Sequence, residues 1–240
     1  MYKWNPKVKG SGIITAIPQT GECPNNCADC FFQSGRSYLE PLAENLPHLP
    51  PEGFDVGRIV RINDGNDSNV DKERVLEMAS AFTDCFFNTA IPNLDFPGPV
   101  VLTINPAKLT DGDYHKIESP PPNLMYVRIR VNTWNIDAVV KPAVDYYTSL
   151  SVPVVLTPMA YYTEILPEGH KDNYEWRKRT LNSYWVLKRE AQKEIEALFA
   201  DNPLVYICGY KGQHACRFCG NCLREYYATK ERLQAEVRDE

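Results

Sequence analysis

The chain has no apolar run close to the roughly 18–20 residues that a membrane-spanning helix requires. Residues 1–6 also lack the apolar stretch of a secretory signal, so we expect a cytoplasmic protein with no membrane partner. Excess positive charge is missing as well, because the net charge is −5, and this balance disfavours a protein that coats nucleic acid. No repeat or long linker divides the 240 residues.

The chain does contain clustered cysteine. Of its eight cysteines, three lie at positions 23, 27 and 30, four lie at 208, 216, 219 and 222, and Cys85 is alone. Dense clusters in a chain without a secretory signal are more typical of metal binding than of a disulfide framework. The sequence therefore predicts two metal sites, with Cys85 as a small buried apolar side chain.

The first group has the spacing C-x3-C-x2-C. Three thiolates can hold a 4Fe–4S cluster by three of its irons and leave the fourth iron for a non-protein ligand. A closed zinc site has four protein ligands, commonly in two pairs, and no second cysteine pair follows Cys30 closely. A zinc site that takes a distant fourth ligand stays open as the alternative.

The second group has the spacing C-x7-C-x2-C-x2-C, at Cys208, Cys216, Cys219 and Cys222. Four thiolates fit either a second 4Fe–4S cluster or a tetrathiolate zinc ion. The compact run favours iron–sulfur over a zinc ribbon, which separates its two pairs. We expect His214 to neighbour a sulfur atom rather than to replace a ligand.

Short apolar runs alternate with helical segments along the chain. Strands are predicted at residues 12–17, 58–62, 99–104, 125–131, 152–157 and 204–207, and helices from about 71, at 136–150, at 173–200 and at 223–237. This alternation predicts an α/β protein with a parallel sheet, whose site collects at the carboxyl ends of its strands. Cys23, the 63–69 turn, Asn105, Asn132, Met159 and Cys208 follow predicted strands and should share one rim.

In these features the chain resembles the radical S-adenosylmethionine (SAM) superfamily, whose members carry C-x3-C-x2-C after the first strand of a partial barrel. The resemblance spans about residues 12–208. It implies a partial (β/α)6 TIM-type barrel of parallel strands over residues 1–207, and a cysteine-rich auxiliary-cluster extension with the last helix over 208–240.

The resemblance also implies a reaction. Cys23, Cys27 and Cys30 would hold an oxygen-sensitive 4Fe–4S cluster whose open iron binds SAM. With electrons from a reductant such as flavodoxin or ferredoxin, SAM would be cleaved to a 5′-deoxyadenosyl radical that abstracts hydrogen from a substrate. Auxiliary clusters in related enzymes often accompany peptide or protein modification, which we favour weakly here.

Contacts to SAM follow from the same resemblance. Gly65-Asn66-Asp67 stands where the family has a Gly-Gly-Glu-like motif for the methionyl ammonium. Arg128, Arg130 and Asn132 share one strand face and would meet the ribose and carboxylate. Before the third cysteine the family commonly has an aromatic residue, whereas this chain has Asp29. Phe31 is expected to supply apolar surface there, and Met159 to line the adenine pocket.

Two functions from other classes stay open at this point. A zinc protein with both cysteine groups structural would recognise RNA or another protein without catalysis. A small ferredoxin-like electron carrier is the third interpretation, although such a carrier needs no barrel-sized pocket. No stretch of the sequence identifies the substrate or a catalytic residue.

Overall fold

The computed structural model describes most of the chain. The described residues are 1–27, 29–30, 32, 38–39, 47–105, 114–158, 160–162, 165–178, 183–209 and 215–239. Within them, no helix is long and apolar enough to cross a membrane.

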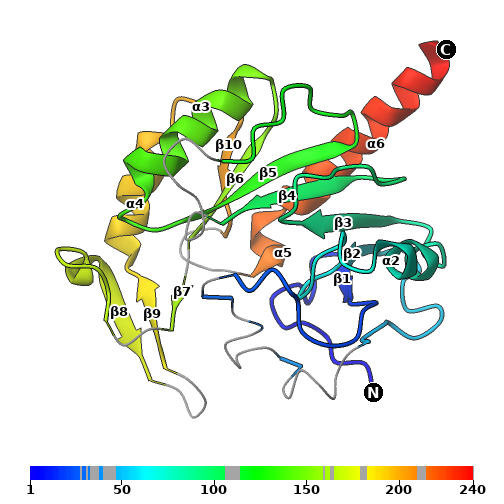
Figure 1. Cartoon of the computed structure of the whole chain (residues 1–240), viewed down its shortest axis with the longest axis horizontal. Coiled ribbons are helices and arrows are strands. Elements are labelled where there is room, and N and C mark those ends of the chain that lie inside the picture. The colour runs from blue at the N-terminus through cyan, green and yellow to red at the C-terminus, as the bar shows by residue number, and fades with distance from the viewer. Residues whose placement is uncertain are drawn as a thin grey trace.

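A parallel sheet of seven strands forms the centre of the molecule (Figure 1). Its spatial order follows the chain: β1 (Ile13–Ala16), β2 (Ile59–Ile62), β3 (Cys85–Thr89), β4 (Val100–Ile104), β5 (Leu124–Val131), β6 (Val154–Pro158) and β10 (Val205–Ile207). Every neighbouring pair is parallel. The predicted α/β class with a parallel sheet is therefore confirmed.

All six predicted strands are present, but the sequence did not reveal β3. Its residues Phe86 and Phe87 are both buried, one in each of the two apolar layers that cover the sheet. The apolar run of this strand, Cys85-Phe86-Phe87, is only three residues long and lacks the β-branched residues that mark the other six strands, so the usual signal of a strand is missing.

The two faces of the sheet are covered by different helices. Val60, Phe87 and Leu102 belong to the larger apolar layer, whereas Ile59 and Val101 point to a smaller one. The larger layer also takes side chains from α2 (Lys72–Ala79), from the π-helical turn η3 (Ile136–Val140) with α3 (Lys141–Ser149), and from α4 (Arg189–Leu198). The smaller layer takes side chains from α6 (Asn221–Asp239), which runs across the middle strands in Figure 1.

The predicted helix at 173–200 is wrong over its first half. After η4 (Lys171–Asn173), residues Tyr174–Arg177 form β8 and Tyr184–Leu187 form β9, and only Arg189–Leu198 is helical. With β7 (Ala160–Tyr161) these strands make a small antiparallel sheet in the order β7-β9-β8. Trp176 and Trp185 pair across β8 and β9 with ring centroids 5.0 Å apart, and cross-strand aromatic pairs of this kind stabilise a sheet.

The end of the chain returns to the sheet. A short helix α5 (Cys216–Cys219) ends at Gly220, whose φ of 70° lets the backbone turn sharply before α6 begins. The backbone N–H of Cys216 donates to the Lys7 carbonyl at 2.8 Å, and Leu223 lies beside Gly12. These contacts hold the last cysteines against the segment that precedes β1.

Candidate functional site

A cavity of about 560 Å³ lies at the carboxyl ends of the parallel strands. Along the face that α6 covers, each strand changes from apolar to polar. Ile59 is followed by Arg61 and Asn63 in and after β2, and Val155 by Thr157 in β6. The apolar residues pack toward α6, and the polar ones line the cavity together with Ile13 and Val155. The small sheet adds a further wall through Tyr184 and Val186 of β9, and the start of α6 adds another through residues 221–223.

The first cysteine group lies on a tight loop beside this cavity. The N–H of Asn26 reaches the Cys23 carbonyl at 3.5 Å, and the N–H of Cys30 donates to the Cys27 carbonyl at 3.2 Å. Asn26 and Asp29 have φ values of 41° and 52°. Asn and Asp tolerate this left-handed conformation better than most residues, so the sequence suits two close turns.

Two thiols of this group, those of Cys27 and Cys30, line the cavity, whereas Cys23 does not. Burial, with the Asp67 carboxylate and the other two thiolates, raises the pKa of Cys23 to about 11, although a backbone hydrogen bond at Asn25 opposes the shift. Without a bound cation the Cys23 thiol therefore stays protonated at neutral pH.

All four cysteines of the second group line the same cavity. Cys208 follows β10 directly, and its N–H donates to the Leu156 carbonyl at 2.7 Å. Cys222 begins α6, and its sulfur lies 3.1 Å from the Tyr126 hydroxyl. The two sequence clusters, almost 180 residues apart between Cys30 and Cys208, thus meet at one site.

The protons of the second group are shared unevenly. A hydrogen bond with Cys208 lowers the pKa of Cys219 to about 6, and the same bond raises the pKa of Cys208 well above its ordinary value. Burial raises the pKa of Cys216, whereas the Arg61 cation opposes that rise. The group therefore carries a thiolate at Cys219, while Cys208 and Cys216 stay protonated.

The fit of these thiols to a metal rests on the number and kind of donors. Within the described ranges, no three His, Cys, Asp or Glu side chains stand close enough together to hold a metal ion. Around one tetrahedral zinc ion, sulfur atoms lie roughly 3.8 Å apart, given a Zn–S distance of about 2.3 Å. Three thiols in one group and four in the other nevertheless match the ligand sets of iron–sulfur clusters.

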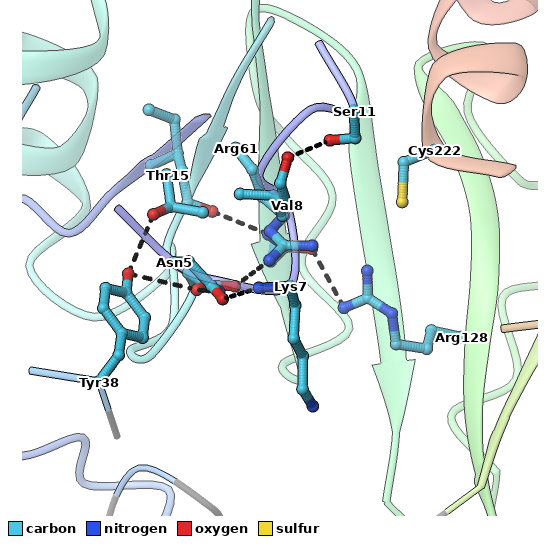
Figure 2. Close-up of polar contacts among 12 residues, drawn as sticks. Asn5, Lys7, Val8, Ser11, Thr15, Tyr38, Arg61, Arg128 and Cys222 are labelled. Carbon is cyan, nitrogen blue, oxygen red and sulfur yellow. Dashed lines mark hydrogen bonds and ion pairs between the residues drawn. The ribbon is translucent and has the colours of Figure 1, made fainter. Parts of the chain in front are cut away.

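Two arginines lie between the sheet and the second cysteine group (Figure 2). Arg61 forms an ion pair with Asp64, and the two side chains are only 11% and 7% exposed. Burial opposes the charge of each arginine, but Asp64 raises the pKa of Arg61, and Tyr126 and Cys222 raise that of Arg128. In Figure 2 the Cys222 sulfur points toward Arg128. Both guanidinium groups are therefore held as cations beside thiols.

Three of the residues predicted to contact SAM line the cavity: Asp29, Arg128 and Arg130. Arg130 donates to the Asp29 carbonyl at 3.0 Å, and the Asp29 carboxylate accepts the N–H of Tyr162 at 3.1 Å. Asp29, where the loop departs from the family pattern, thus ties the cysteine loop to β5 and to the residue after β7.

Asp67 lies outside the cavity and is fully engaged by the chain itself. Its carboxylate accepts hydrogen bonds from Asn25, Asn69, Thr89 and the N–H of Ala90, at 2.6–3.0 Å. Only 3% of the residue is exposed. In this structure Asp67 joins the cysteine loop to the end of β3, and its lone pairs already have partners.

Gly65 and Asn66 likewise serve local packing. A Cβ atom at Gly65 would collide with the ring of Phe32, so glycine leaves room for this ring beside the turn after β2. The side-chain oxygen of Asn66 accepts the N–H of Asp67 at 2.9 Å. Neither residue lines the cavity.

The remaining predicted contacts lie elsewhere. Asn132 is 2% exposed, and its side-chain oxygen caps the turn after β5 by accepting the N–H of Trp134 and of Asn135. Phe31, Met159 and His214 lie outside the described residues.

The structure adds site residues that sequence reasoning missed. Arg61 and Tyr126 were interpreted only as parts of strands, and Asn88 lies on the unpredicted β3, yet all three line the cavity. Alternation gave a usable signal for Arg61, because it is the polar residue between Val60 and Ile62. The same alternation marked Tyr126, because it lies two residues before Arg128 and therefore shares the strand face of Arg128 and Arg130.

Comparison of this chain with models of protein families, with curated proteins and with solved structures finds no match.

Proposed function

We propose that this protein is a radical SAM enzyme built on a partial (β/α)6 barrel. One observation carries the proposal: two cysteine groups far apart in sequence line one cavity at the carboxyl edge of a parallel sheet. The strand order, which follows the chain without a reversal, is compatible with such a barrel. A structural zinc protein needs neither a shared cavity nor polar strand ends around it.

Cys23, Cys27 and Cys30 would hold the 4Fe–4S cluster, with the fourth iron open to SAM. The chemistry that such a cluster supplies when bound is reductive cleavage of SAM to methionine and a 5′-deoxyadenosyl radical, which abstracts hydrogen from the substrate. Electrons would come from a cytoplasmic reductant such as flavodoxin or ferredoxin.

The chain's own residues would position this loop. Asp67 ties Asn25 to the end of β3, and Asp29 ties the third cysteine's neighbourhood to Arg130 and Tyr162. These bonds restrict the loop between its first and third thiols. A fixed loop matters because reacting groups must be held within about 0.5 Å of their productive positions.

Cys208, Cys216, Cys219 and Cys222 would hold a second 4Fe–4S cluster, or alternatively a zinc ion. Full ligation by four cysteines favours electron transfer or a structural role, because substrate binding requires an open iron. The substrate stays unidentified, with peptide or protein modification weakly favoured.

Anaerobic reconstitution with iron and sulfide tests the proposal. We expect about eight irons per chain, as two 4Fe–4S clusters require, and dithionite-dependent release of 5′-deoxyadenosine from SAM. Cys27→Ala should abolish the release. The matched control is Cys85→Ala, because Cys85 lies at the start of β3 and outside the cavity lining, and it should keep most of the activity.

Tight zinc at both groups, with no cleavage of SAM under reducing conditions, would instead support the zinc-binding interaction module. Iron uptake without SAM cleavage would leave an electron carrier as the better function.

A further inference from the structure

The cavity is positively charged although the whole chain is acidic. Among the described residues that line it, the cations are Lys7, Arg61, Arg128, Arg130 and Arg177, and the carboxylates are Asp29 and Asp64. The chain as a whole has a net charge of −5. Five cations against two carboxylates and the Cys219 thiolate still leave an excess of positive charge, and a cleft of this kind attracts anions.

The two carboxylates are already engaged. Asp64 pairs with Arg61 and also accepts a hydrogen bond from Asn5. The Asp29 carboxylate accepts the backbone N–H of Tyr162. Neither one is an ion-pair partner of Arg128, so the charge of Arg128 is balanced by neither.

Arg128 has only neutral hydrogen-bond partners within the described part of the chain. Its guanidinium reaches Asn88 at 3.3 Å, Thr103 at 3.5 Å and the Tyr126 hydroxyl at 3.1 Å. Thr103 is also its neighbour in the register of β4 and β5. These contacts fix the plane of the guanidinium at the middle of the sheet, and their lengths leave its N–H groups able to donate to a stronger acceptor.

We propose that Arg128 binds an oxyanion of the substrate, either a carboxylate or a phosphate, on the sheet side of the cavity beside Cys222. A planar guanidinium whose hydrogen-bond partners are Asn88, Thr103 and Tyr126 suits such a group, because it offers parallel N–H donors and a charge with which no described carboxylate pairs. The assignment to the substrate rests on the proposed function, whereas the anion site itself does not.

Alkylation of the cavity thiols offers a direct test on the full, metal-free chain. Iodoacetate carries a carboxylate and iodoacetamide does not, while both need a thiolate sulfur to displace iodide. We therefore divide the iodoacetate rate by the iodoacetamide rate at the same cysteine. The thiolate fraction of that cysteine cancels in this ratio. We expect the ratio at Cys222, measured by peptide mass spectrometry, to fall about tenfold in Arg128→Gln.

Arg177→Gln is the matched control, because Arg177 also lines the cavity but is 48% exposed and pairs with Glu175. Its ratio should change less than twofold, as expected for a screened surface charge. The iodoacetate-to-iodoacetamide ratio at Cys222 should fall less in Arg128→Lys than in Arg128→Gln. An unchanged ratio in Arg128→Gln would overturn the site.

Protection of the wild-type chain provides a readout that needs no variant. Orthophosphate and propionate, each compared with chloride at equal ionic strength, should slow iodoacetate more than iodoacetamide. The better protector identifies which oxyanion the site prefers. If both protect no better than chloride, the anion site is excluded.

SAM itself carries a carboxylate, so the anion at Arg128 could belong to the substrate or to SAM. Measuring SAM binding to the chain reconstituted with iron and sulfide separates these two sources. The family resemblance implies a contact between Arg128 and SAM, but in the structure Arg128 lies beside the second cysteine group and Arg130 lies beside the first. Arg128→Gln should therefore leave SAM affinity within about twofold. A tenfold loss would assign the anion site to the cofactor and overturn the substrate assignment. If loaded wild-type protein releases no 5′-deoxyadenosine but the alkylation ratio still depends on Arg128, the proposed function fails and the anion site stands.

Discussion

The two cysteine groups present the same donor atom in two different environments. Cys23, Cys27 and Cys30 lie on a loop that the Asp67 carboxylate holds through Asn25, and burial, with a smaller effect of Asp67, raises the pKa of Cys23. The second group lies at strand and helix ends beside two arginines, and Cys219 carries a lowered pKa. Burial at Cys23 and the hydrogen bond from Cys208 at Cys219, rather than cysteine spacing, therefore decide which thiol is ionised before any metal binds.

Loss of the brace at Asp67 should have the largest effect. Asp67→Ala removes an acceptor of four hydrogen bonds and leaves the N–H of Ala90 and the Thr89 hydroxyl without it. We expect about 3 kcal/mol of destabilisation in urea unfolding. Asp145→Ala, on the exposed side of α3, should stay within about 0.5 kcal/mol. The first cysteine group should also alkylate faster, with little change in the second; equal acceleration of both groups would contradict a local brace.

The difference in pKa between Cys219 and Cys23 predicts different thiol reactivity in the metal-free chain. At pH 7, pKa values of about 6 and about 11 give Cys219 roughly 10⁴ times the thiolate fraction of Cys23. Lower intrinsic nucleophilicity reduces this advantage, so we expect about 50-fold faster alkylation at Cys219. The Cys219 rate should level off above its pKa as pH rises, whereas the Cys23 rate should keep rising to about pH 11. Iodoacetamide labelling across pH checks this, and parallel pH profiles would contradict the contrast.

Packing of the Phe32 ring, just after the first cysteine group, against Gly65 in the turn after β2 predicts a smaller effect on stability. Gly65→Ala places a Cβ against the buried Phe32 ring and should cost about 2 kcal/mol of unfolding free energy. Gly98→Ala is the control, because a Cβ there meets Phe87 only at 3.8 Å. Adding Phe32→Leu to Gly65→Ala should recover part of the loss if the ring is the obstacle. Additive losses in the double variant would refute that cause.

Loss of the hydrogen bond between Tyr126 and Cys222 should have the smallest effect on stability. Tyr126→Phe removes that bond and the contact to Arg128, while the ring keeps its packing. We expect about 1 kcal/mol of destabilisation by urea unfolding. A changed alkylation rate should appear at Cys222 and not at Cys27, which lies in the other group. A change at Cys27 of equal size would show that the two groups are not independent.

Much of the fold was predictable because apolar strands and their spacing are local signals. Six of the seven parallel strands and the last helix were placed from the sequence alone. β3 was missed because its short run lacks β-branched residues, and the first half of 173–200 was misassigned because Tyr184 and Leu187 fit the same helical stripe as Ala191, Ile195 and Leu198. Asp67 was expected at a cofactor, yet the structure commits its oxygens to the chain.

The sequence by itself determined the two thiol groups and the parallel α/β order, because ligand spacing and strand-helix alternation are written along the chain. Only the tertiary structure decided that both groups line one cavity, and that Arg61, Tyr126 and Arg128 lie beside the second group. The physical reason is that register and pleat join residues from different strands. A local pattern shows that a side chain points out of a strand, but the packed sheet decides what it meets.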